Sequence, residues 1–502
     1  MNLDNFVEND IKRKIELIDC LRKSTIYRNV VELSDELGIT RKTLAKDLDE
    51  LLLLSHEKNC KNLFDNQSRV GYRIDPNLKK EILLIKQTIY LSSFNLFFLT
   101  KLLSKDVNLV ELMSLTHLSE ATIRKKLGAL RILLQEFNLT IRYKKGYFSI
   151  LGNESAIRFF YFTLYWKLYR GVSWNFQEVS EMKLLRLVNS YIEEFDVPIT
   201  GNGRMQILYF LAIGMIRYHR NKKIPANFFG DEYQRGLDAL NTSTGLNEKW
   251  FASINTSTIE ANYFLLFIST RATFSRKYYT FFQENEEIFK HTRAWIATEK
   301  FIDYFDKTIL GLSLEQKIIL RKNLYPIHIY ADFFDRKQDL AINEYSIDND
   351  YFLTKTIQLF DTACTSLFRE TNYSLFKNKE YLIQQYIFTL AMFKDIHYFE
   401  PPISILIDAD VPYNSTKRIV EYLSKLLSLE FNILIYDQYD EALQQHYDIL
   451  FTTNALDHAS INRTVKYSRT VYIDIDFRIS DYTRIKEVLI DVYNEKIRAA
   501  LL

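Results

Sequence analysis

Residues 30–51 read VVELSDELGITRKTLAKDLDEL, and their pattern predicts the fold of the N-terminal end of the chain. Its leucines recur every three or four residues on each side of Gly38, which predicts two short amphipathic helices. Gly38 can leave the first helix with positive φ, and Thr40 is a good N-cap for the second. Two helices joined at a sharp angle by such a short turn are typical of a helix-turn-helix, whose second helix enters the major groove of DNA.

The same pattern returns further along the chain, in a register that places Leu109 at the position of Val30. Residues 109–130 read LVELMSLTHLSEATIRKKLGAL, and apolar residues again occupy most of the shifted positions. Thr40 maps to Ser119, which can also cap a helix. Each copy is followed by a hairpin-like segment with a glycine where a tight turn is needed, residues 69–74 (RVGYRI) and residues 144–150 (KKGYFSI). Two copies in register, each with a trailing hairpin, predict two winged helix-turn-helix units.

The second helix and the hairpin of each unit carry cations and hydroxyls that can donate to base edges and phosphates. Residues 1–155 contain 25 Lys and Arg against 20 Asp and Glu, so the basic excess of the chain lies at this end. The excess alone is too small to identify a nucleic-acid partner. The predicted DNA-binding residues are Arg41, Lys42, Thr43, Lys46, Arg69, Arg73, Thr122, Arg124, Lys125, Lys126, Lys144 and Lys145.

The composition indicates a mainly helical, cytoplasmic protein. Its 502 residues include only 13 Gly and 7 Pro, which leaves little room for an all-β architecture. Three scattered cysteines indicate a reducing compartment, and the first residues lack the pattern of a signal peptide. The longest uncharged apolar stretch near the start is shorter than the roughly 18 residues of a membrane helix, so we expect no membrane contact. The spacing of the eight histidines indicates no metal site, and we expect neither a cofactor nor catalysis.

The pattern of the chain changes from helical to alternating after Pro402. Short apolar runs alternate with helical segments from there on, at residues 403–407, 431–435, 448–452 and 471–475, and a last helix begins near residue 482. This alternation predicts a small parallel α/β domain of about 100 residues. Ligands in such sheets bind beyond the strand C-termini, where Asp408, Asp410 and Asn414 stand. These carboxylates could bind a cation, but we interpret the segment as a solvated loop.

Taken in this order, the parts resemble the Mga/AtxA family of Gram-positive virulence-gene regulators. The most telling stretch is residues 140–165, where a wing leads through Leu151-Gly-Asn-Glu154 into a helix that begins IRFFY at Ile157. The resemblance implies a multidomain, mainly α fold. Its expected parts are winged helix-turn-helix domains at 1–76 and 77–152, helical PTS regulation domains (PRDs) at 153–283 and 284–400, and a domain similar to the IIB component of sugar phosphotransferase systems (PTS) at 401–502.

The resemblance also implies control of the PRDs by histidine phosphorylation. In the first PRD, residues 206–211 hold no histidine where one is expected, and His219 lies beyond them. In the second PRD, His328 falls in the corresponding helix and is the better candidate. True IIB enzymes carry a phosphorylated cysteine after their first strand, whereas this chain has Asp408-Ala-Asp-Val-Pro412 there. We therefore expect the last domain to serve assembly as a homodimer.

The expected function is a regulator of virulence or carbohydrate-responsive genes that binds double-stranded promoter DNA and is modulated by PTS phosphocarrier proteins. One alternative is a PRD-containing RNA-binding antiterminator, and the duplicated helix-turn-helix argues against it. The other is a PTS phosphotransferase-related protein, and the missing cysteine argues against that.

Overall fold

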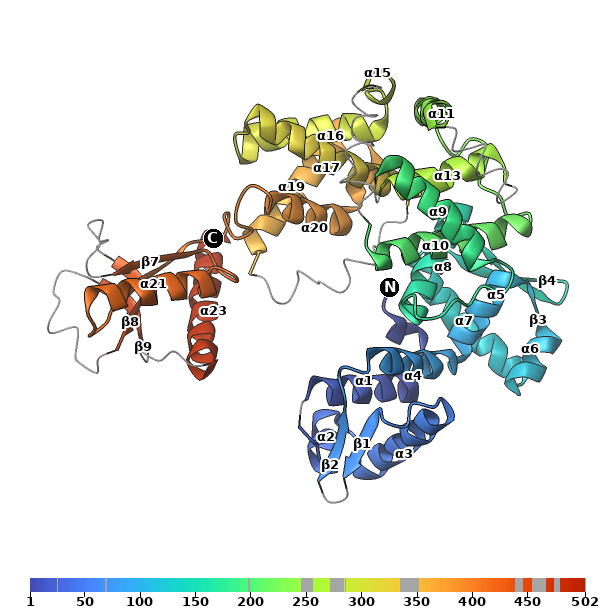
Figure 1. The fold of residues 1–502 in the computed structure, drawn as a ribbon, viewed down its shortest axis with the longest axis horizontal. Helices are drawn as coiled ribbons and strands as arrows, with labels where there is room; N and C mark the ends of the chain where they lie inside the picture. The colour runs from blue at the N-terminus through green and yellow to red at the C-terminus, as the bar shows by residue number, and fades with distance from the viewer. Residues whose placement is uncertain are drawn as a thin grey trace. The chain divides into compact units, whose positions relative to one another are not determined.

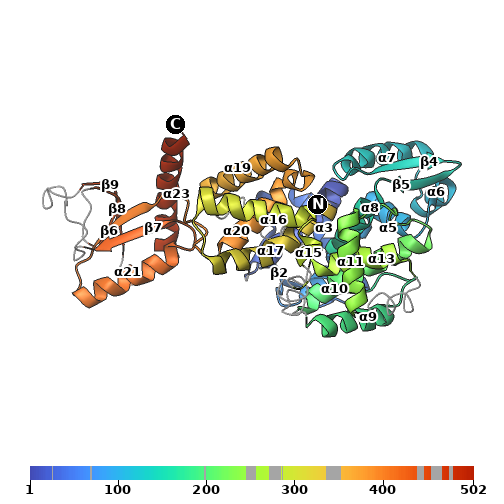
Figure 2. The ribbon, with the colours of Figure 1, turned by 90° about the horizontal axis from the view of Figure 1, so that it is seen from above.

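The computed structural model describes the chain except for residues 25, 68–69, 197–198, 245–255, 271–283, 285, 335–351, 438–445, 454–465, 474–478 and 502. The chain divides into two compact units. The first contains residues 1–299 and 325–343, and the second contains residues 300–324 and 344–502. Figures 1 and 2 label most of the helices and strands of both units.

One winged helix-turn-helix lies at the start of the chain. After a short 3-10 helix, η1 (Leu3–Phe6), come α1 (Asn9–Lys23), α2 (Val30–Glu36), α3 (Arg41–Glu57), β1 (Phe64–Gln67) and β2 (Gly71–Ile74). The strands β1 and β2 form an antiparallel hairpin, and Arg28 extends it through an isolated bridge to Tyr72.

The second helix-turn-helix repeats this order of elements. A connecting helix, α4 (Lys79–Leu91), leads into α5 (Phe94–Ser104), β3 (Val107–Asn108), α6 (Leu109–Thr116), α7 (Glu120–Gln135), β4 (Thr140–Lys144) and β5 (Tyr147–Leu151). The sheet has the order β3-β5-β4. Val107 of β3 is the counterpart of Arg28 in the register of the repeat, so the short third strand belongs to the repeat as well. The predicted pair of winged units is present.

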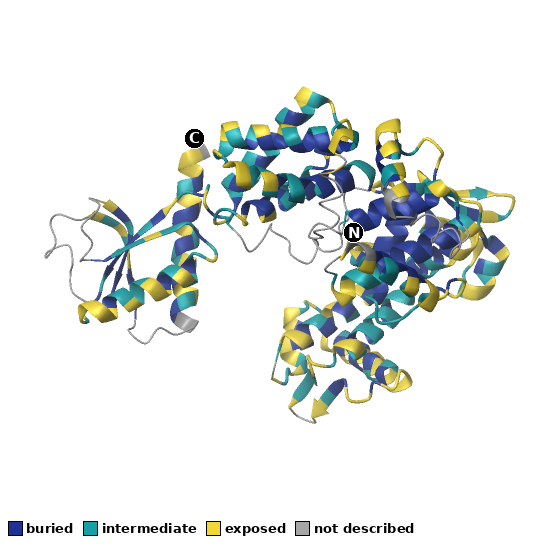
Figure 3. Ribbon diagram, turned by 45° about the horizontal axis from the view of Figure 1, so that its top comes forward, coloured by how far each residue is buried: buried dark blue, intermediate teal, exposed yellow. Residues whose placement is uncertain are grey.

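The apolar positions of the repeat form the cores of both units. Leu44, Leu48 and Leu51 of α3 are buried, as are their counterparts Ile123, Leu127 and Leu130 of α7. Figure 3, which colours the ribbon by burial, shows buried and exposed residues alternating along the helices. Burying a leucine side chain stabilises a fold by roughly 1.5–3 kcal/mol, so the three-or-four-residue spacing determines which face of each helix turns inward.

The middle of the chain is helical, as expected. The helices are α8 (Glu154–Tyr169), α9 (Glu181–Phe195), α10 (Gly201–His219), α11 (Asp231–Thr244), α13 (Thr258–Ser269), α15 (Glu286–Phe289), α16 (Arg293–Tyr304), the π-helix η2 (Phe305–Ile309), α17 (Leu314–Phe333), α19 (Thr354–Thr371), η4 (Ser374–Lys377) and α20 (Lys379–Leu390). Residue 283, at the predicted boundary between two bundles, lies outside the described residues.

Helix α10 is the centre of the helical part of the first unit. It packs on α8 and α9, which lie beside it in Figures 1 and 2. Aromatic rings dominate this packing. Phe210 of α10 stacks on Phe267 of α13 with ring centroids 3.6 Å apart, and it forms a T-shaped pair with Phe162 of α8 at a centroid distance of 5.6 Å. The many Phe and Tyr of the sequence therefore form the contacts between helices.

The C-terminal segment forms the predicted parallel α/β domain. Its elements are β6 (Ile403–Asp408), α21 (Tyr413–Leu427), β7 (Ile433–Asp437), β8 (His446–Thr452), β9 (Lys466–Tyr472) and α23 (Ile479–Leu501). The four strands are parallel in the order β7-β6-β8-β9. Leu423 of α21 and Leu489 of α23 join Ile405 and Phe451 in one core cluster.

Several predicted boundaries in this domain were wrong. The strand β7 lies two residues later than the predicted run 431–435, and β8 begins two residues before the predicted residue 448. The last strand begins at Lys466 and ends at Tyr472, whereas the apolar run pointed to residues 471–475, of which 474 and 475 lie outside the described residues. The strand β9 forms one end of the described sheet and is exposed at alternate positions, so it lacks the continuous apolar run of a buried strand. The final helix begins at Ile479, earlier than the predicted start near residue 482.

No single helix among the described residues is both long enough and apolar enough to cross a membrane. Within the described part of the chain, α4 and α5 taken together reach the required length and hydropathy, but they are bent by 90° at the break between them.

Candidate nucleic-acid interface

The two second helices, α3 and α7, begin with the same hydrogen bonds. The hydroxyl of Thr40 accepts from the backbone N–H of Thr43 at 3.2 Å, and the hydroxyl of Ser119 accepts from that of Thr122 at 3.3 Å. In both units the two hydroxyls lie 2.9 Å apart. Thr43 and Thr122, both predicted to bind DNA, therefore also take part in the helix caps, and the start of each helix is fixed in the same way.

The helices that precede them are also capped in register, by residues that the sequence analysis missed. The side chain of Asn29 accepts from the backbone N–H of Glu32, and Asn108, its counterpart in the second copy, accepts from Val110 and Glu111. Asparagine is among the best N-caps, so the repeated Asn-x-x-Glu spacing was a readable signal.

The turn between the two helices has a left-handed residue in both units. Gly38 has φ +62°, as predicted, and His117 occupies the equivalent position with φ +54°. A non-glycine residue adopts this conformation less readily, because its Cβ crowds the backbone. The second unit therefore reaches the same turn geometry without the glycine that made the first copy recognisable.

In the first unit, three predicted cations lie on the exposed side of α3. Arg41 and Lys42 are exposed and form no ion pair with any residue that the structure describes. Lys46, with 75% of its side chain exposed, approaches Glu50 at 3.8 Å. The acidic residue Asp47 is buried and paired with Arg13 of α1, so it does not face outward with these cations.

In the second unit, the predicted cations of α7 differ in their partners. Lys125 is exposed and forms no ion pair within the described part of the chain. Arg124 pairs with Glu120 at 2.7 Å and lies over the ring of Tyr143. Lys126 is half-buried and lies 2.7 Å from Glu8, the residue that precedes α1. Of the three, Lys125 is therefore the one most available to a phosphate.

The wing of the second unit adds two exposed cations. Lys144 ends β4, and Lys145 occupies the two-residue turn with Gly146. Both turn residues have positive φ, +50° and +84°, which is the type I′ geometry that suits a tight hairpin. Arg142, also exposed on β4, was missed by the sequence analysis. Residues 94–151 hold nine Lys and Arg against four Asp and Glu, a clear basic excess.

The wing of the first unit differs. Arg73 pairs with Asp65 across the hairpin at 2.9 Å and lies over the ring of Tyr27. Arg69 lies outside the described residues. Gly71 stands not in the turn but beside Arg28, where a Cβ atom would lie 2.3 Å from the carbonyl oxygen of that residue. The glycine allows the close approach of two backbones, so the prediction that it forms a tight turn was wrong.

The two histidines named as phosphorylation candidates lie in very different surroundings. His219 is exposed at the end of α10. His328 is fully buried, with its Nδ1 2.8 Å from the hydroxyl of Thr298, and burial lowers its pKa to about 3. A partner protein can reach the first of these rings directly, whereas the second requires α17 to move.

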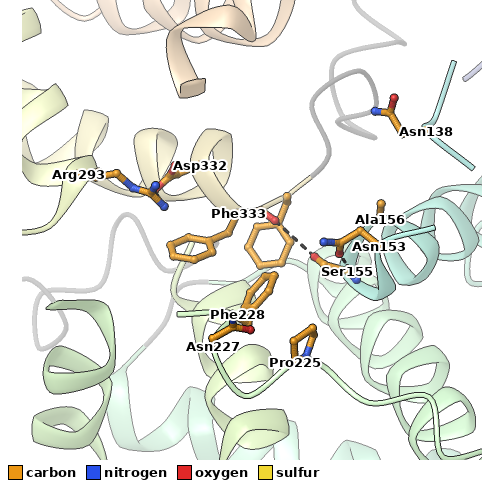
Figure 4. A pocket seen from close by; sticks show the side chains of 11 residues that line it. Asn138, Asn153, Ser155, Ala156, Pro225, Asn227, Phe228, Arg293, Asp332 and Phe333 are labelled. Atoms are coloured by element: carbon orange, nitrogen blue, oxygen red, sulfur yellow. Dashed lines mark hydrogen bonds and ion pairs between the residues drawn. The ribbon is translucent and has the colours of Figure 1, made fainter. Parts of the chain in front are cut away.

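A polar cavity of about 560 Å³ lies within the first unit. Figure 4 shows Arg293 and Asp332 at one side of it and Asn153 and Ser155 at the other. The guanidinium and the carboxylate are 3.2 Å apart, and the Ser155 hydroxyl donates to the carbonyl of Phe333 at 3.4 Å. The volume suits a small molecule, and the lining suits a polar one.

The loop predicted after the first strand of the α/β domain is shorter than expected, because Asp408 ends β6 and Asn414 lies in α21. The backbone N–H of Asp410 donates to the Thr453 hydroxyl, and the carbonyl of Asp408 accepts from the Thr453 N–H. Cys364 lies outside this domain, in α19, where it is fully buried and burial raises its pKa to about 12. Its thiol is therefore unreactive at neutral pH.

Comparison with known proteins agrees with the geometry of the second unit. Residues 78–165 match the family model of the Mga helix-turn-helix domain. The chain is 22% identical over 223 residues to the capsule synthesis positive regulator AcpB of Bacillus anthracis, and 24% identical over 229 residues to AcpA of the same organism. These matches cover 44% and 43% of this chain, and 45% and 44% of the relatives' own lengths. They confirm the resemblance to the Mga/AtxA family that the sequence indicated.

Proposed function

We propose that this relative of the Mga/AtxA regulators is a transcription regulator that binds promoter DNA through its two winged helix-turn-helix units. The observation that carries the proposal is the repeated geometry. Both second helices begin with matching hydroxyl caps, and both present exposed cations on their outer side. Cations at such positions donate to phosphates and to base edges in the major groove.

The second unit supplies more of the DNA affinity than the first in this proposal. Residues 94–151 carry five more basic than acidic residues, whereas residues 9–74 carry two more. Because counterion release from DNA dominates affinity and depends on the number of phosphates contacted, the more basic unit contributes more.

Binding to duplex DNA separates this proposal from the RNA-binding alternative. The test measures the affinity of the full chain for upstream duplex DNA from its own locus, with an RNA hairpin and a random duplex of equal length as competitors. The proposal expects the upstream duplex to bind tighter than either competitor. Equal or tighter binding of the RNA hairpin would favour an antiterminator instead.

For control by the PTS, His219 is the more accessible of the two candidate histidines. A phosphate would place about two negative charges on an exposed ring that is followed by Arg220, Lys222 and Lys223. Control through His328 would require α17 to open first. Incubation with phosphoenolpyruvate and the general PTS proteins, followed by mass spectrometry under acid-free conditions, tests both sites. A chain that takes up no phosphate would remove PTS control from the proposal.

We also propose that the α/β domain serves self-association and not phosphotransfer. It has no cysteine in its sequence, and it exposes large apolar side chains: Tyr413 and Tyr422 on α21, and Leu429 just after it. Exposed aromatic and aliphatic groups of this kind are common at protein interfaces. The partner in this proposal is a second copy of the chain, because symmetric dimers are the commonest oligomers.

A further inference from the structure

The last turn of α10 contacts the second helix-turn-helix unit directly. The helix is buried along most of its length, from Ile207 to Arg217, and it forms the centre of the helical part. Arg220 follows as its C-cap. A displacement of α10 therefore moves this arginine by a similar amount, because a packed helix moves as a rigid element.

Arg220 donates to three acceptors in the second helix-turn-helix unit. One nitrogen of its guanidinium lies 2.9 Å from the carbonyl oxygen of Leu102 and 2.8 Å from that of Leu103. The other lies 2.7 Å from a carboxylate oxygen of Asp106. The two carbonyls belong to the last turn of α5, where backbone oxygens have no partner within the helix, and a cation there is favoured by the helix dipole.

The same three acceptors lead directly into the helix-turn-helix. Asp106 is followed by β3, and Asn108 at the end of β3 is the N-cap of α6. Only a short segment therefore separates the arginine contacts from the first helix of the motif. Losing these contacts would free the segment between α5 and α6 from α10.

A second contact fixes the other end of the unit. Arg217, one turn earlier on α10, binds both oxygens of Glu154 at 3.0 and 2.6 Å, and Glu154 begins α8 shortly after the wing strand β5. Glu154 also accepts from Arg158, which in turn pairs with the buried Glu260 of α13. All four side chains are buried or nearly so.

The Arg217–Glu154 and Arg220–Asp106 contacts differ in the free energy needed to break them. Removing one partner of a buried pair leaves an uncompensated charge, which is strongly unfavourable, so the Arg217–Glu154 contact holds the exit of the wing in place. The Arg220–Asp106 pair is partly exposed, with 16% and 44% of the side chains accessible, and water can replace it at small cost. The segment that leads into α6 can therefore move more easily than the segment that leaves the wing.

We infer that Arg220 is a positioning residue that couples the helical part to the second helix-turn-helix, so that a shift of α10 changes DNA affinity. This inference rests on the proposed function for its DNA readout. The contact itself is tested without DNA. In this inference the arginine acts on DNA affinity through its contacts with Leu102, Leu103 and Asp106.

The test compares Arg220→Ala with Lys222→Ala in the full chain. Lys222 is exposed in the same turn and carries the same charge, and only its backbone oxygen takes part in the buried cluster. Hydrogen exchange of the amides in residues 102–116 is measured first, followed by duplex DNA affinity. Arg220→Ala should exchange faster in this segment and bind DNA about five- to tenfold more weakly, the usual size of a coupling between sites. Lys222→Ala should match the parent in exchange.

Two results would overturn the inference. If exchange of residues 102–116 is the same in Arg220→Ala as in the parent, the contact does not order the entry to α6. If exchange rises but DNA affinity stays within twofold, the contact is structural only. Arg220→Lys separates charge from geometry, because a lysine can still pair with Asp106 but lacks the planar fork that also reaches the two carbonyls. Its affinity should fall between those of the parent and Arg220→Ala. A parent chain that binds no duplex DNA contradicts the proposed function, while the exchange measurement still decides whether Arg220 orders this segment.

Discussion

At the scale of single residues, ion pairs sort the predicted DNA-binding cations into two groups. Lys126 pairs with Glu8, before α1, and Arg73 pairs with Asp65 of its own hairpin, whereas Lys125 forms no ion pair among the described residues. Sequence alone could not separate them, because the partner Glu8 lies 118 positions away from Lys126. The helical spacing predicted which cations lie on the outer side of each helix. Their ion-pair partners depend on how segments far apart in the sequence pack together.

This difference predicts unequal effects of two neighbouring substitutions. Lys125→Ala should weaken binding to all duplex sequences and lower the slope of log affinity against log salt by about one, as expected for one lost phosphate contact. Lys126→Ala should change the slope by less, because its ammonium already pairs with Glu8. Lys183→Ala, at an exposed position on α9, is the control. A larger change in Lys126→Ala than in Lys125→Ala would contradict the assignment.

The buried His328 predicts a pH dependence of stability. Burial lowers its pKa from the ordinary 6.5 to about 3, so the unfolded chain binds a proton near pH 6 while the folded chain does not. The stability from this residue is complete above pH 6.5 and is lost as pH falls below that value, by about 2 kcal/mol between pH 7 and pH 5. His328→Gln should lose less stability over this range in thermal melts. A variant that loses as much as the parent would show that other groups dominate.

At the scale of elements, the repeat was predictable and its third strand was not. Leucine spacing and the hydroxyl caps located four helices, because these local signals act within one or two turns. The strand β3 is very short and pairs with β5, which follows both helices of the motif, so no local periodicity reveals it. The same holds for β9, whose alternating exposure hides it from a search for apolar runs.

Two glycines of the first unit should respond differently to the same substitution. The Cβ atom of Gly38→Ala would have no neighbouring atom within 4 Å. The substitution should therefore lower the free energy of unfolding only by the strain of a positive φ, about 1–2 kcal/mol. Gly71→Ala should cost more, because its Cβ would lie 2.3 Å from the Arg28 carbonyl oxygen and the hairpin must separate from Arg28. Chemical denaturation of both variants measures the difference. A Gly71→Ala chain as stable as Gly38→Ala would mean that the bridge between Arg28 and Tyr72 is unimportant.

At the scale of the whole molecule, the α/β domain is tied to the helices before it within the second unit. Phe352 stacks on Phe431 at 4.4 Å, and the Tyr493 hydroxyl of α23 donates to the buried Glu400 at 2.8 Å. Removing the domain would expose these groups, so a truncated chain is a poor test of self-association. The alternation of apolar runs and helical segments predicted the domain itself, whereas this attachment depends on aromatic side chains whose partners the sequence does not reveal.

Surface substitutions test self-association without this difficulty. Tyr422→Glu and Leu429→Glu together should convert a dimer to a monomer in sedimentation, because each places a charge on an exposed apolar position near the end of α21. Lys425→Glu also changes the charge of α21, but at a residue that is already polar and exposed, and should leave the dimer intact. A double variant that sediments like the parent would place the interface elsewhere.

The central claim is that both helix-turn-helix units bind one DNA duplex and that the second contributes more. The most direct measurement is the salt dependence of duplex affinity for two triple variants of the full chain. Replacing Lys125, Lys144 and Lys145 by alanine should lower the slope by about three, one for each lost phosphate contact. Replacing Arg41, Lys42 and Lys46 should lower it too, by a smaller amount. Slopes that stay at the parent value in both variants would contradict the claim.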